Sequence, residues 1–438
     1  MPEFKIVSTE ENGNDIVYNV EPIAPNTDCP DCGSTNTVSN GSYNRFVRDL
    51  NCFDKHVGIR ILGTKHKCKD CGHVFVEEYE SIENNRRITV RLKEKIRADA
   101  AKHKFSAIAE DYCITNQTVK NIFIEYVSEL DTARVIKAPR VLGIDEAHIK
   151  NSECATFVDV ESSMILEILD NRKKNSVMKF IESFEDSENI KVVTMDMCRS
   201  YKEAVQEVLP YAAIVVDRFH VIKNLNKIVD DFRIEFFKTN CKPEERHTLP
   251  IDTNTKMIKG ALLSNADNLT GKQIMCLDRL FTDYPVFNVL YDLKEAFRLI
   301  YDCNDKKEAQ DMYAEWKKQA LSSFPGFKPF IKTVENWHDE IFNFFDGRYS
   351  NGIVERINGK IKEIYRAGHG YSFDVLRFKV LYGTSATRKA VFSFNKSGMV
   401  GSSYIASINS LFSYGPKLES GFGVSIDELH NIIKRNGF

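Results

Sequence analysis

The sequence lacks several features that would set it apart from ordinary soluble proteins. It has no apolar run of about 18 residues, so no membrane span is expected. Its first residues, Met1-Pro2-Glu3-Phe4-Lys5, contain no basic segment followed by an apolar stretch, so no signal peptide is visible. The net charge is only −2, which does not by itself indicate a nucleic-acid binder. We therefore expect a cytoplasmic protein whose eleven cysteines need no disulfides in a reducing compartment.

The size and composition predict a soluble chain with several cores. A chain of 438 residues is too long for one core and should divide into three or four units. Apolar residues make up 42% and charged residues 28%, as in globular proteins. Basic residues outnumber acidic ones from 86 to 140 and from 346 to 396, and local basic surface is what phosphate binding requires. The two tryptophans, Trp316 and Trp337, are expected to be core residues.

Two matching cysteine pairs predict a zinc site in residues 1–82. Each pair has the pattern C-x-x-C-G, in Cys29-Pro30-Asp31-Cys32-Gly33 and in Cys68-Lys69-Asp70-Cys71-Gly72. Four such thiolates close a tetrahedral structural Zn²⁺ site and leave no open position for catalysis. Alternating apolar residues from 57 to 62 fit ribbon strands between the pairs. The alternative interpretation is two redox or coincidental C-x-x-C sequences.

Residues 85–135 have the pattern of a helix-turn-helix. A short helix from Phe105 to Glu110 is followed by a break at 113–115 and a second helix from Asn116, capped by Thr115 or Asn116. In that plan the polar face of the second helix enters the major groove of DNA. The predicted groove residues are Gln117, Thr118, Lys120 and Asn121. The predicted phosphate contacts are Arg86, Arg87 and Arg91. A helical linker or a dimerisation hairpin would produce a similar pattern.

Residues 138–225 predict an α/β core of RNase H-like (retroviral-integrase-like) topology. Three strands, a helix, a strand, a helix and a strand follow one another from residue 141 to 216. In this topology the first and fourth strands are neighbours. Asp145 ends the first apolar run and Asp196 ends the fourth, so the two carboxylates should lie together at the strand ends, where α/β sheets bind ligands.

A third carboxylate, Glu355, lies on a predicted helix in residues 346–392, the second part of the core. An isoleucine stripe (353, 357, 361, 364) forms one face of this helix. The far face carries Glu355 together with Asn358, Lys362 and Arg366, which are predicted to contact DNA. A solvated face with ordinary ion pairs is the alternative. Residues 226–345 predict an all-α insertion, and the tail at 393–438 is assigned no role.

Asp145, Asp196 and Glu355 predict a metal-dependent nuclease site. Such carboxylates can hold two Mg²⁺ (or Mn²⁺) ions about 4 Å apart for in-line phosphoryl displacement. Asp217 also ends an apolar strand and is the rival for the second ligand. If Asp196 is the ligand, Asp217 and His220 become supporting residues that orient the phosphate or a flanking base. Asp217 could alternatively cap the following helix.

Four sequence runs together resemble a bacterial DDE transposase. They are Gly143-Ile144-Asp145-Glu146, the run 195–201 (MDMCRSY), the run 217–221 (DRFHV) and the run 351–355 (NGIVE). The resemblance is most specific to the ISL-three insertion-sequence family, which also carries an N-terminal zinc ribbon and helix-turn-helix. It covers roughly residues 25 to 390.

This resemblance implies a transposase that binds the terminal repeats of its element and catalyses DNA strand cleavage and strand transfer. The implied partners are double-stranded DNA, both element ends and target, and a second copy of the chain, at least as a dimer on DNA. The implied location is the bacterial cytoplasm, at the nucleoid when bound, with no membrane partner. Two alternatives stay open: a catalytically silent DNA-binding regulator derived from a transposase, and a structure-specific RNase H-like nuclease.

Overall fold

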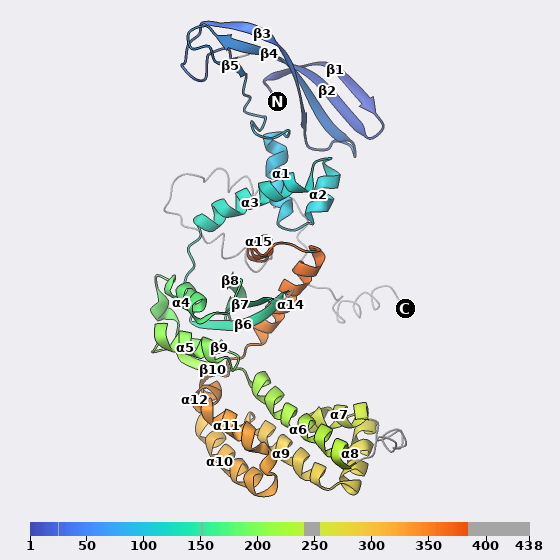
Figure 1. Cartoon of the computed structure of the whole chain (residues 1–438), viewed down its shortest axis with the longest axis vertical. Coiled ribbons are helices and arrows are strands. Elements are labelled where there is room, and N and C mark those ends of the chain that lie inside the picture. Colours follow the sequence, from blue (N-terminus) through green and yellow to red (C-terminus); the bar gives the residue numbers. More distant parts are fainter. Residues whose placement is uncertain (25, 150–151, 241–254, 384–438) are drawn as a thin grey trace, which may run out of the picture. The chain divides into compact units, whose positions relative to one another are not determined.

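The computed structural model describes residues 1–24, 26–149, 152–240 and 255–383 (Figure 1). These residues all belong to one compact unit of the chain. Among them, no helix combines the length and the apolar character needed to cross a bilayer. The predicted tail at 393–438, and the last residues of the predicted second part of the core, lie outside the described residues.

The N-terminal region is a twisted sheet of five strands. They are β1 (Phe4–Asn12), β2 (Asp15–Pro22), β3 (Thr37–Arg48), β4 (His56–Cys68) and β5 (Val74–Val76). The sheet order is β1-β2-β4-β3, with β5 also pairing with β4. Val57, Ile59 and Ile61 alternate along β4 and are buried, as the period of a half-buried strand requires. The predicted ribbon strand between the cysteine pairs is therefore confirmed.

Three helices follow, α1 (Val90–Ala100), α2 (Phe105–Asp111) and α3 (Asn116–Thr132). The Oγ1 atom of Thr115 accepts a hydrogen bond from the Thr118 amide at 3.1 Å, so Thr115 is the N-cap of α3. The helices share one apolar core to which each contributes a stripe, including Leu92, Ile96, Ile108, Val119 and Phe123. The short helix, the break and the second helix are present as predicted.

The central sheet has the strand order β10-β9-β6-β7-β8. Its strands are β6 (Val141–Ile149), β7 (Ser152–Asp159), β8 (Met164–Ile168), β9 (Val192–Met195) and β10 (Ala213–Val216). β7 runs antiparallel to β6, whereas β9 runs parallel to β6 and to β10. The helices α4 (Lys174–Glu182) and α5 (Arg199–Val208) share a core with one face of the sheet. This is the predicted RNase H-like order.

The prediction that Asp145 ends its strand is wrong, because β6 continues to Ile149. The continuation is stabilised by pairing with β7, from Glu146 opposite Ala155 to Ile149 opposite Ser152. Ala147 and Ile149 are also buried in the cluster formed with the C-terminal helices. Asp145 therefore lies inside a strand, where it pairs with Thr156 of β7 one residue beyond the last β6–β9 pair.

Two C-terminal helices, α14 (Gly352–Ala367) and α15 (Phe373–Gly383), pack on the core, and α14 lies alongside β6 (Figure 1). Gly143 permits the close approach of α14. A Cβ atom at this position would lie 2.6 Å from Val354 Cγ2, which is far inside van der Waals contact. The lack of a side chain on β6 thus determines how near the Glu355 helix comes to the sheet.

Between β10 and α14 the described chain is entirely helical. Its α-helices are α6 (Arg218–Asn240), α7 (Thr255–Leu263), α8 (Gly271–Asp283), α9 (Val286–Ile300), α10 (Lys306–Ser323), α11 (Lys328–Asn336), α12 (His338–Phe342) and α13 (Phe344–Gly347). They share a large aromatic core in which Trp316 is buried, and its Nε1 donates to the Leu293 carbonyl at 2.7 Å. Trp337 is only half-buried. The predicted boundary at residue 226 falls inside α6, which runs unbroken from the central α/β core into the insertion.

Candidate active site

Three aspartates meet because the sheet pairs three strands in register. Ile144 in β6 pairs with Met195 in β9, and Met195 pairs with Val216 in β10. The residue after each of these three is an aspartate, namely Asp145, Asp196 and Asp217. The backbone amide of Asp217 donates to the Met195 carbonyl at 3.0 Å, which extends the register by one residue. The strand order thus places the two predicted carboxylates and their rival at one edge.

Asp145 is buried and held at both carboxylate oxygens. The Glu146 amide donates to Oδ1 at 2.7 Å, and Asn358 Nδ2 donates to Oδ2 at 2.8 Å. Burial, together with the negative charge of Asp196, raises the pKa of Asp145 to about 7. Two carboxylates placed this close without a compensating ion repel each other, and a bound cation would relieve that repulsion.

Asn358 does not lie on an exposed DNA-facing surface, contrary to the prediction. It is 4% exposed because it shares one face of α14 with Val354 and Ile361, and that face packs against the sheet. Its amide orients Asp145, so it positions a carboxylate. Its Oδ1 atom is buried and has no hydrogen-bond partner within the described residues, which leaves an acceptor free for a ligand such as a hydrated cation.

Asn351 is a second positioning residue, which the sequence analysis did not single out. It is fully buried at the start of α14. Its side chain accepts from Thr194 Oγ1 at 3.1 Å and donates to the Ile144 carbonyl at 3.4 Å. These bonds tie the N-terminus of α14 to β6 one residue before Asp145 and to β9 two residues before Asp196. The asparagine ahead of an otherwise apolar helical start was the available signal.

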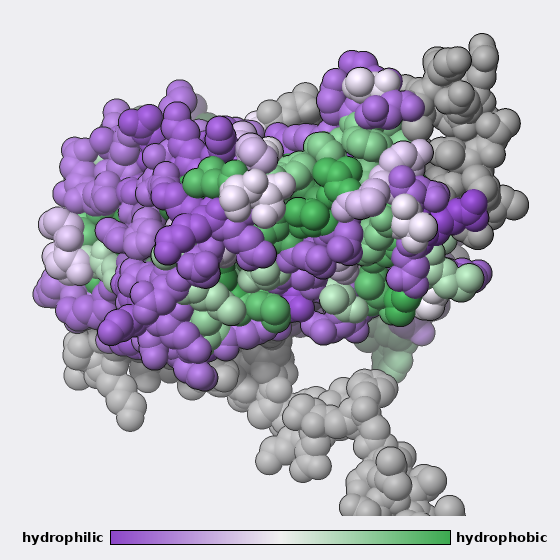
Figure 2. Space-filling view, turned by 90° about the horizontal axis from the view of Figure 1, so that it is seen from below, coloured by the Kyte–Doolittle hydropathy of each residue, from purple (hydrophilic) through white to green (hydrophobic). Residues whose placement is uncertain are grey.

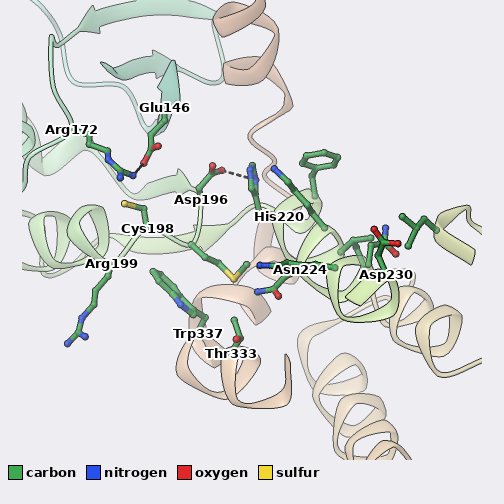
Figure 3. Close-up of a pocket in the computed structure, with 17 residues that line it drawn as sticks. Glu146, Arg172, Asp196, Cys198, Arg199, His220, Asn224, Asp230, Thr333 and Trp337 are labelled. Atoms are coloured by element: carbon green, nitrogen blue, oxygen red, sulfur yellow. Dashed lines mark hydrogen bonds and ion pairs between the residues drawn. The ribbon is translucent and has the colours of Figure 1, made fainter. Parts of the chain in front are cut away.

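His220 links the second aspartate to its rival. Its Nδ1 atom lies 2.8 Å from Asp196 Oδ1 (Figure 3). The same atom lies 3.7 Å from Asp217 Oδ2. Burial disfavours the imidazolium, but the interactions with Asp196 and Asp217 outweigh burial and raise the pKa of His220 to about 10. The imidazolium therefore partly neutralises the carboxylates. Asp217 is 3% exposed, whereas Asp196 is half-buried and opens into a cavity.

Glu355 reaches this cluster from the first turn of α14. Ligand atoms of Asp217, His220 and Glu355 all lie within 4.8 Å of one another. Burial and the charge of Asp217 raise the pKa of Glu355. The structure thus brings Asp145, Asp196, Asp217 and Glu355 into one group. Within this group, the carboxylate of Glu355 lies close to Asp217 and His220. A set of carboxylate oxygens suits a hard cation such as Mg²⁺ or Mn²⁺, so the residues fit the predicted metals.

The four cysteines also meet as predicted. Cys29 Sγ lies 3.6 Å from Cys71 Sγ, and Cys32 Sγ lies 3.6 Å from Cys68 Sγ. A zinc tetrahedron with Zn–S bonds of about 2.3 Å has edges of about 3.8 Å, so these separations fit Zn²⁺. Gly33 and Gly72 have positive φ angles of 71° and 76°, the turn conformation that glycine permits. Backbone amides of Cys71 and Asp70 lower the pKa of Cys68 to about 7, which favours the thiolate form.

Two family models and one relative match this chain. Residues 142–380, more than half of the chain, match the model of the ISL3-type DDE transposases, described as "Transposase". The chain belongs to this transposase family. Residues 25–71 match the family described as "zinc-finger of transposase IS204/IS1001/IS1096/IS1165". The chain is also 25% identical over 375 residues to the "Transposase for insertion sequence element IS1001" of Bordetella parapertussis, covering 83% of this chain and 89% of that protein.

The predicted groove-contacting residues of this transposase lie at the start of α3. Gln117 and Asn121 are exposed and lie one turn apart, and Gln117 Nε2 donates to Asn121 Oδ1 at 2.7 Å. Thr118 and Lys120 are half-buried, and the Thr118 hydroxyl bonds that of Thr115 at 2.9 Å. The two amides are therefore the accessible polar groups of the predicted set.

The residues predicted to contact phosphates differ in whether their charge is already paired with a carboxylate of the protein. Arg91 forms an ion pair with the buried Asp49, and Arg86 pairs with Glu125 at 2.6 Å. Both guanidinium groups are therefore already paired with carboxylates, although Arg91 itself is exposed. Arg87 is exposed. On α14, Arg366 is exposed and Lys362 is half-buried, and neither has an ion-pair partner among the described residues. Free positive charge therefore lies on the Glu355 helix.

Proposed function

We propose that this transposase binds the terminal repeats of its insertion sequence, cleaves DNA strands there and joins the cut ends to target DNA. The observation that carries the proposal is that the neighbouring strands β6, β9 and β10 bring Asp145, Asp196 and Asp217 together, with Glu355 of α14 beside them, in a chain of the ISL3-type family. We assign Asp145, Asp196 and Glu355 as the ligands of Mg²⁺ or Mn²⁺ and Asp217 and His220 as their supports.

We assign Asp196 rather than Asp217 as the second metal ligand because Asp196 lies beside Asp145 and its side chain is more exposed. Asp196 lies beside Asp145 closely enough that its charge helps to raise the pKa of Asp145. The side chain of Asp196 is 21% exposed and lines a cavity of about 1020 Å³, whereas that of Asp217 is 4% exposed and lines a smaller cavity of about 410 Å³. A ligand that must meet a scissile phosphate needs that access. Asp217 then holds His220 at the start of α6.

The protein groups around the carboxylates prepare the site. Asn358 and the Glu146 amide hold Asp145 in one orientation, and His220 holds Asp196 while balancing part of the negative charge. Divalent cations bound there would supply activation of the attacking water or DNA 3′-hydroxyl and stabilisation of the departing 3′-oxygen. The free cations Lys362 and Arg366 lie on the same side of α14 as Glu355 and would contact the DNA backbone.

DNA selection is assigned to the N-terminal modules. Gln117 and Asn121 present amides that can pair with adenine edges in the major groove, with Thr118 and Lys120 beside them. Arg87 is available for a phosphate contact, while the compensated Arg86 and Arg91 stabilise the module. Because two element ends must be brought together, we propose at least a homodimer on DNA.

The test is strand transfer of labelled element-end DNA into a plasmid with Mg²⁺. The wild-type chain should cleave the end and join it, and Asp145→Asn should lose at least about 1,000-fold in rate while still binding the end. Binding of the end without any cutting or joining would contradict the proposal and favour a DNA-binding regulator. Cutting of branched DNA or RNA without joining would favour a structure-specific nuclease.

A further inference from the structure

A cavity of about 1020 Å³ opens beside the catalytic carboxylates, between the core and the helical insertion (Figure 3). Asp196, His220 and Glu146 line its inner end. A molecule that fills this cavity therefore touches residues of the catalytic cluster. Cavities of about 300–1,000 Å³ hold small ligands, so there is room here for one or two nucleotides but not for a duplex.

One stripe of α6 lines this cavity with an aromatic ring and two cations. Phe219, Lys223 and Lys227 are spaced four residues apart and so lie on one face of the helix. Phe219 is 53% exposed, which is unusual for a large aromatic side chain. Lys223 and Lys227 are exposed and have no ion-pair partner among the described residues. The acidic residue farther along the stripe, Asp230, is already paired with Arg233 and Lys259.

The remaining walls add groups that bind bases. Trp337 lines the cavity from the end of α11 (Figure 3). The Lys202 Nζ atom lies 4.9 Å from the centre of its ring. Asn224 and Asn226 add side-chain amides from α6. Aromatic rings on which bases stack, cations for the phosphates and amides for base edges are the combination by which proteins hold unpaired nucleotides.

Phe219 lies between two cavities and lines both of them. It lines the cavity beside Asp196 and, with Ile222, a second cavity of about 410 Å³ that includes Asp217 and Glu355. Its ring packs edge-on against His220, with centroids 5.4 Å apart. An exposed ring that separates two cavities on either side of a catalytic cluster can separate two neighbouring bases of a strand crossing that cluster.

We infer that the cavity beside Asp196 receives an unpaired nucleotide of the DNA strand being cut, with its base stacked on Phe219. This inference rests on the proposed function, because the nucleotide is continuous with the phosphate held at the carboxylates. Stacking on Phe219 offsets the cost of unpairing, and Lys223 and Lys227 bind the flanking phosphates. Phe219 thereby positions the scissile phosphate without taking part in the chemistry.

The first test is permanganate reactivity of thymines in element-end DNA bound to the full chain, in an Asp145→Asn background that leaves the DNA uncut. One or two thymines next to the cleavage position should become reactive, and Phe219→Ala should reduce that reactivity at least about threefold. A matched control is Tyr211→Ala, which removes a 52% exposed aromatic residue outside both cavities and should change nothing. A complex in which every thymine stays protected would overturn the inference.

The second test supplies the DNA already unpaired. On paired DNA, Phe219→Ala should join ends about 10- to 100-fold more slowly, and Phe219→Trp should keep most of the rate. On DNA with a mismatch at the reactive position, Phe219→Ala should come within about threefold of wild type. A merely structural defect would persist on both substrates, and that result would overturn the inference. If the wild-type chain joins ends without unpairing any base, the proposed function stands and this inference alone fails. If the wild-type chain neither binds nor joins end DNA, both fail.

Discussion

Asp145 shows how individual side chains prepare the proposed catalytic cluster. Its carboxylate accepts one hydrogen bond from its own strand and one from Asn358, which lies 213 residues later in the sequence. Burial and the neighbouring Asp196 raise its pKa to about 7. The structure therefore orients the carboxylate at a site where its negative charge is costly, and binding of a cation offsets that cost.

Asn358→Ala should reduce strand transfer about 10- to 100-fold, because residues that orient metal ligands typically contribute this much. The variant loses the 2.8 Å bond to Asp145 Oδ2 and should need more Mg²⁺ for half-maximal activity. Asn288→Ala, which truncates an exposed asparagine on α9, is the matched control and should behave as wild type. Wild-type Mg²⁺ dependence in Asn358→Ala would contradict the assigned role.

Metal binding should depend on pH through Asp145. With a pKa of about 7, its carboxyl group is mostly protonated at pH 6 in the metal-free protein and must lose that proton to bind Mg²⁺. Affinity should therefore fall about tenfold for each pH unit below about 7 and level off above it. Calorimetric titration with Mg²⁺ in buffers of different ionisation enthalpy measures the released proton. Asp145→Asn should abolish this component, and a pH-independent affinity in the wild-type chain would contradict the account.

At the scale of elements, the sequence predicts the order and kind of nearly every strand and helix of the core. Short apolar runs for the strands and apolar positions at helical spacing were enough, because buried elements leave a local pattern in the sequence. The length of β6, the burial of Asn358 and the role of Asn351 were not predictable in this way. Each depends on a long-range contact of α14 with the sheet, such as the close approach of Val354 to Gly143.

The same limit applies to the basic residues of the helix-turn-helix. In sequence, Arg86 and Arg91 look like DNA contacts, but their partners Glu125 and Asp49 lie about 40 residues away and become neighbours only on folding. The cysteine pairs were predictable because each C-x-x-C-G sequence builds half of the site locally. Local patterns thus predict local geometry, while charge pairing between elements requires the structure.

The zinc ribbon should depend on its metal for folding. Zinc binding to such sites is worth about 10–16 kcal/mol, as much as the stability of a whole domain. Cys68→Ser should therefore lower bound zinc, measured by mass spectrometry, from about one ion per chain to nearly none and weaken binding to element ends. Cys113→Ser removes an exposed thiol outside the cluster and should keep the zinc. Full zinc content in Cys68→Ser would show that the four thiolates do not act together.

At the scale of the whole molecule, DNA binding must come from local charge, because the chain carries a net −2. Most arginines near α1 form ion pairs with carboxylates of the protein. On α14, by contrast, three exposed basic residues have no ion-pair partner among the described residues: Arg356, Lys360 and Arg366. These cations lie on the helix that carries Glu355. We therefore expect the catalytic core itself to contribute much of the phosphate binding.

Replacing Lys362 and Arg366 by alanine should weaken DNA binding equally for specific and unrelated sequences. Each lost phosphate contact lowers the slope of log K against log salt by about 0.9, so the double variant should lose nearly two. Fluorescence anisotropy at several salt concentrations measures this slope. Lys318→Ala, on the exposed surface of α10, is the control. An unchanged slope would move the phosphate contacts to another surface.

The most direct test of the central claim is a metal-specificity switch at the second aspartate. Asp196→Cys and Asp217→Cys are compared in strand transfer of element-end DNA with Mg²⁺ and with Mn²⁺, since Mn²⁺ accepts a thiolate ligand more readily than Mg²⁺. We expect Asp196→Cys to be inactive with Mg²⁺ and to regain joining with Mn²⁺, while Asp217→Cys should show no such difference. Recovery by Mn²⁺ in Asp217→Cys alone would contradict the account and make Asp217 the ligand beside Asp145 and Glu355.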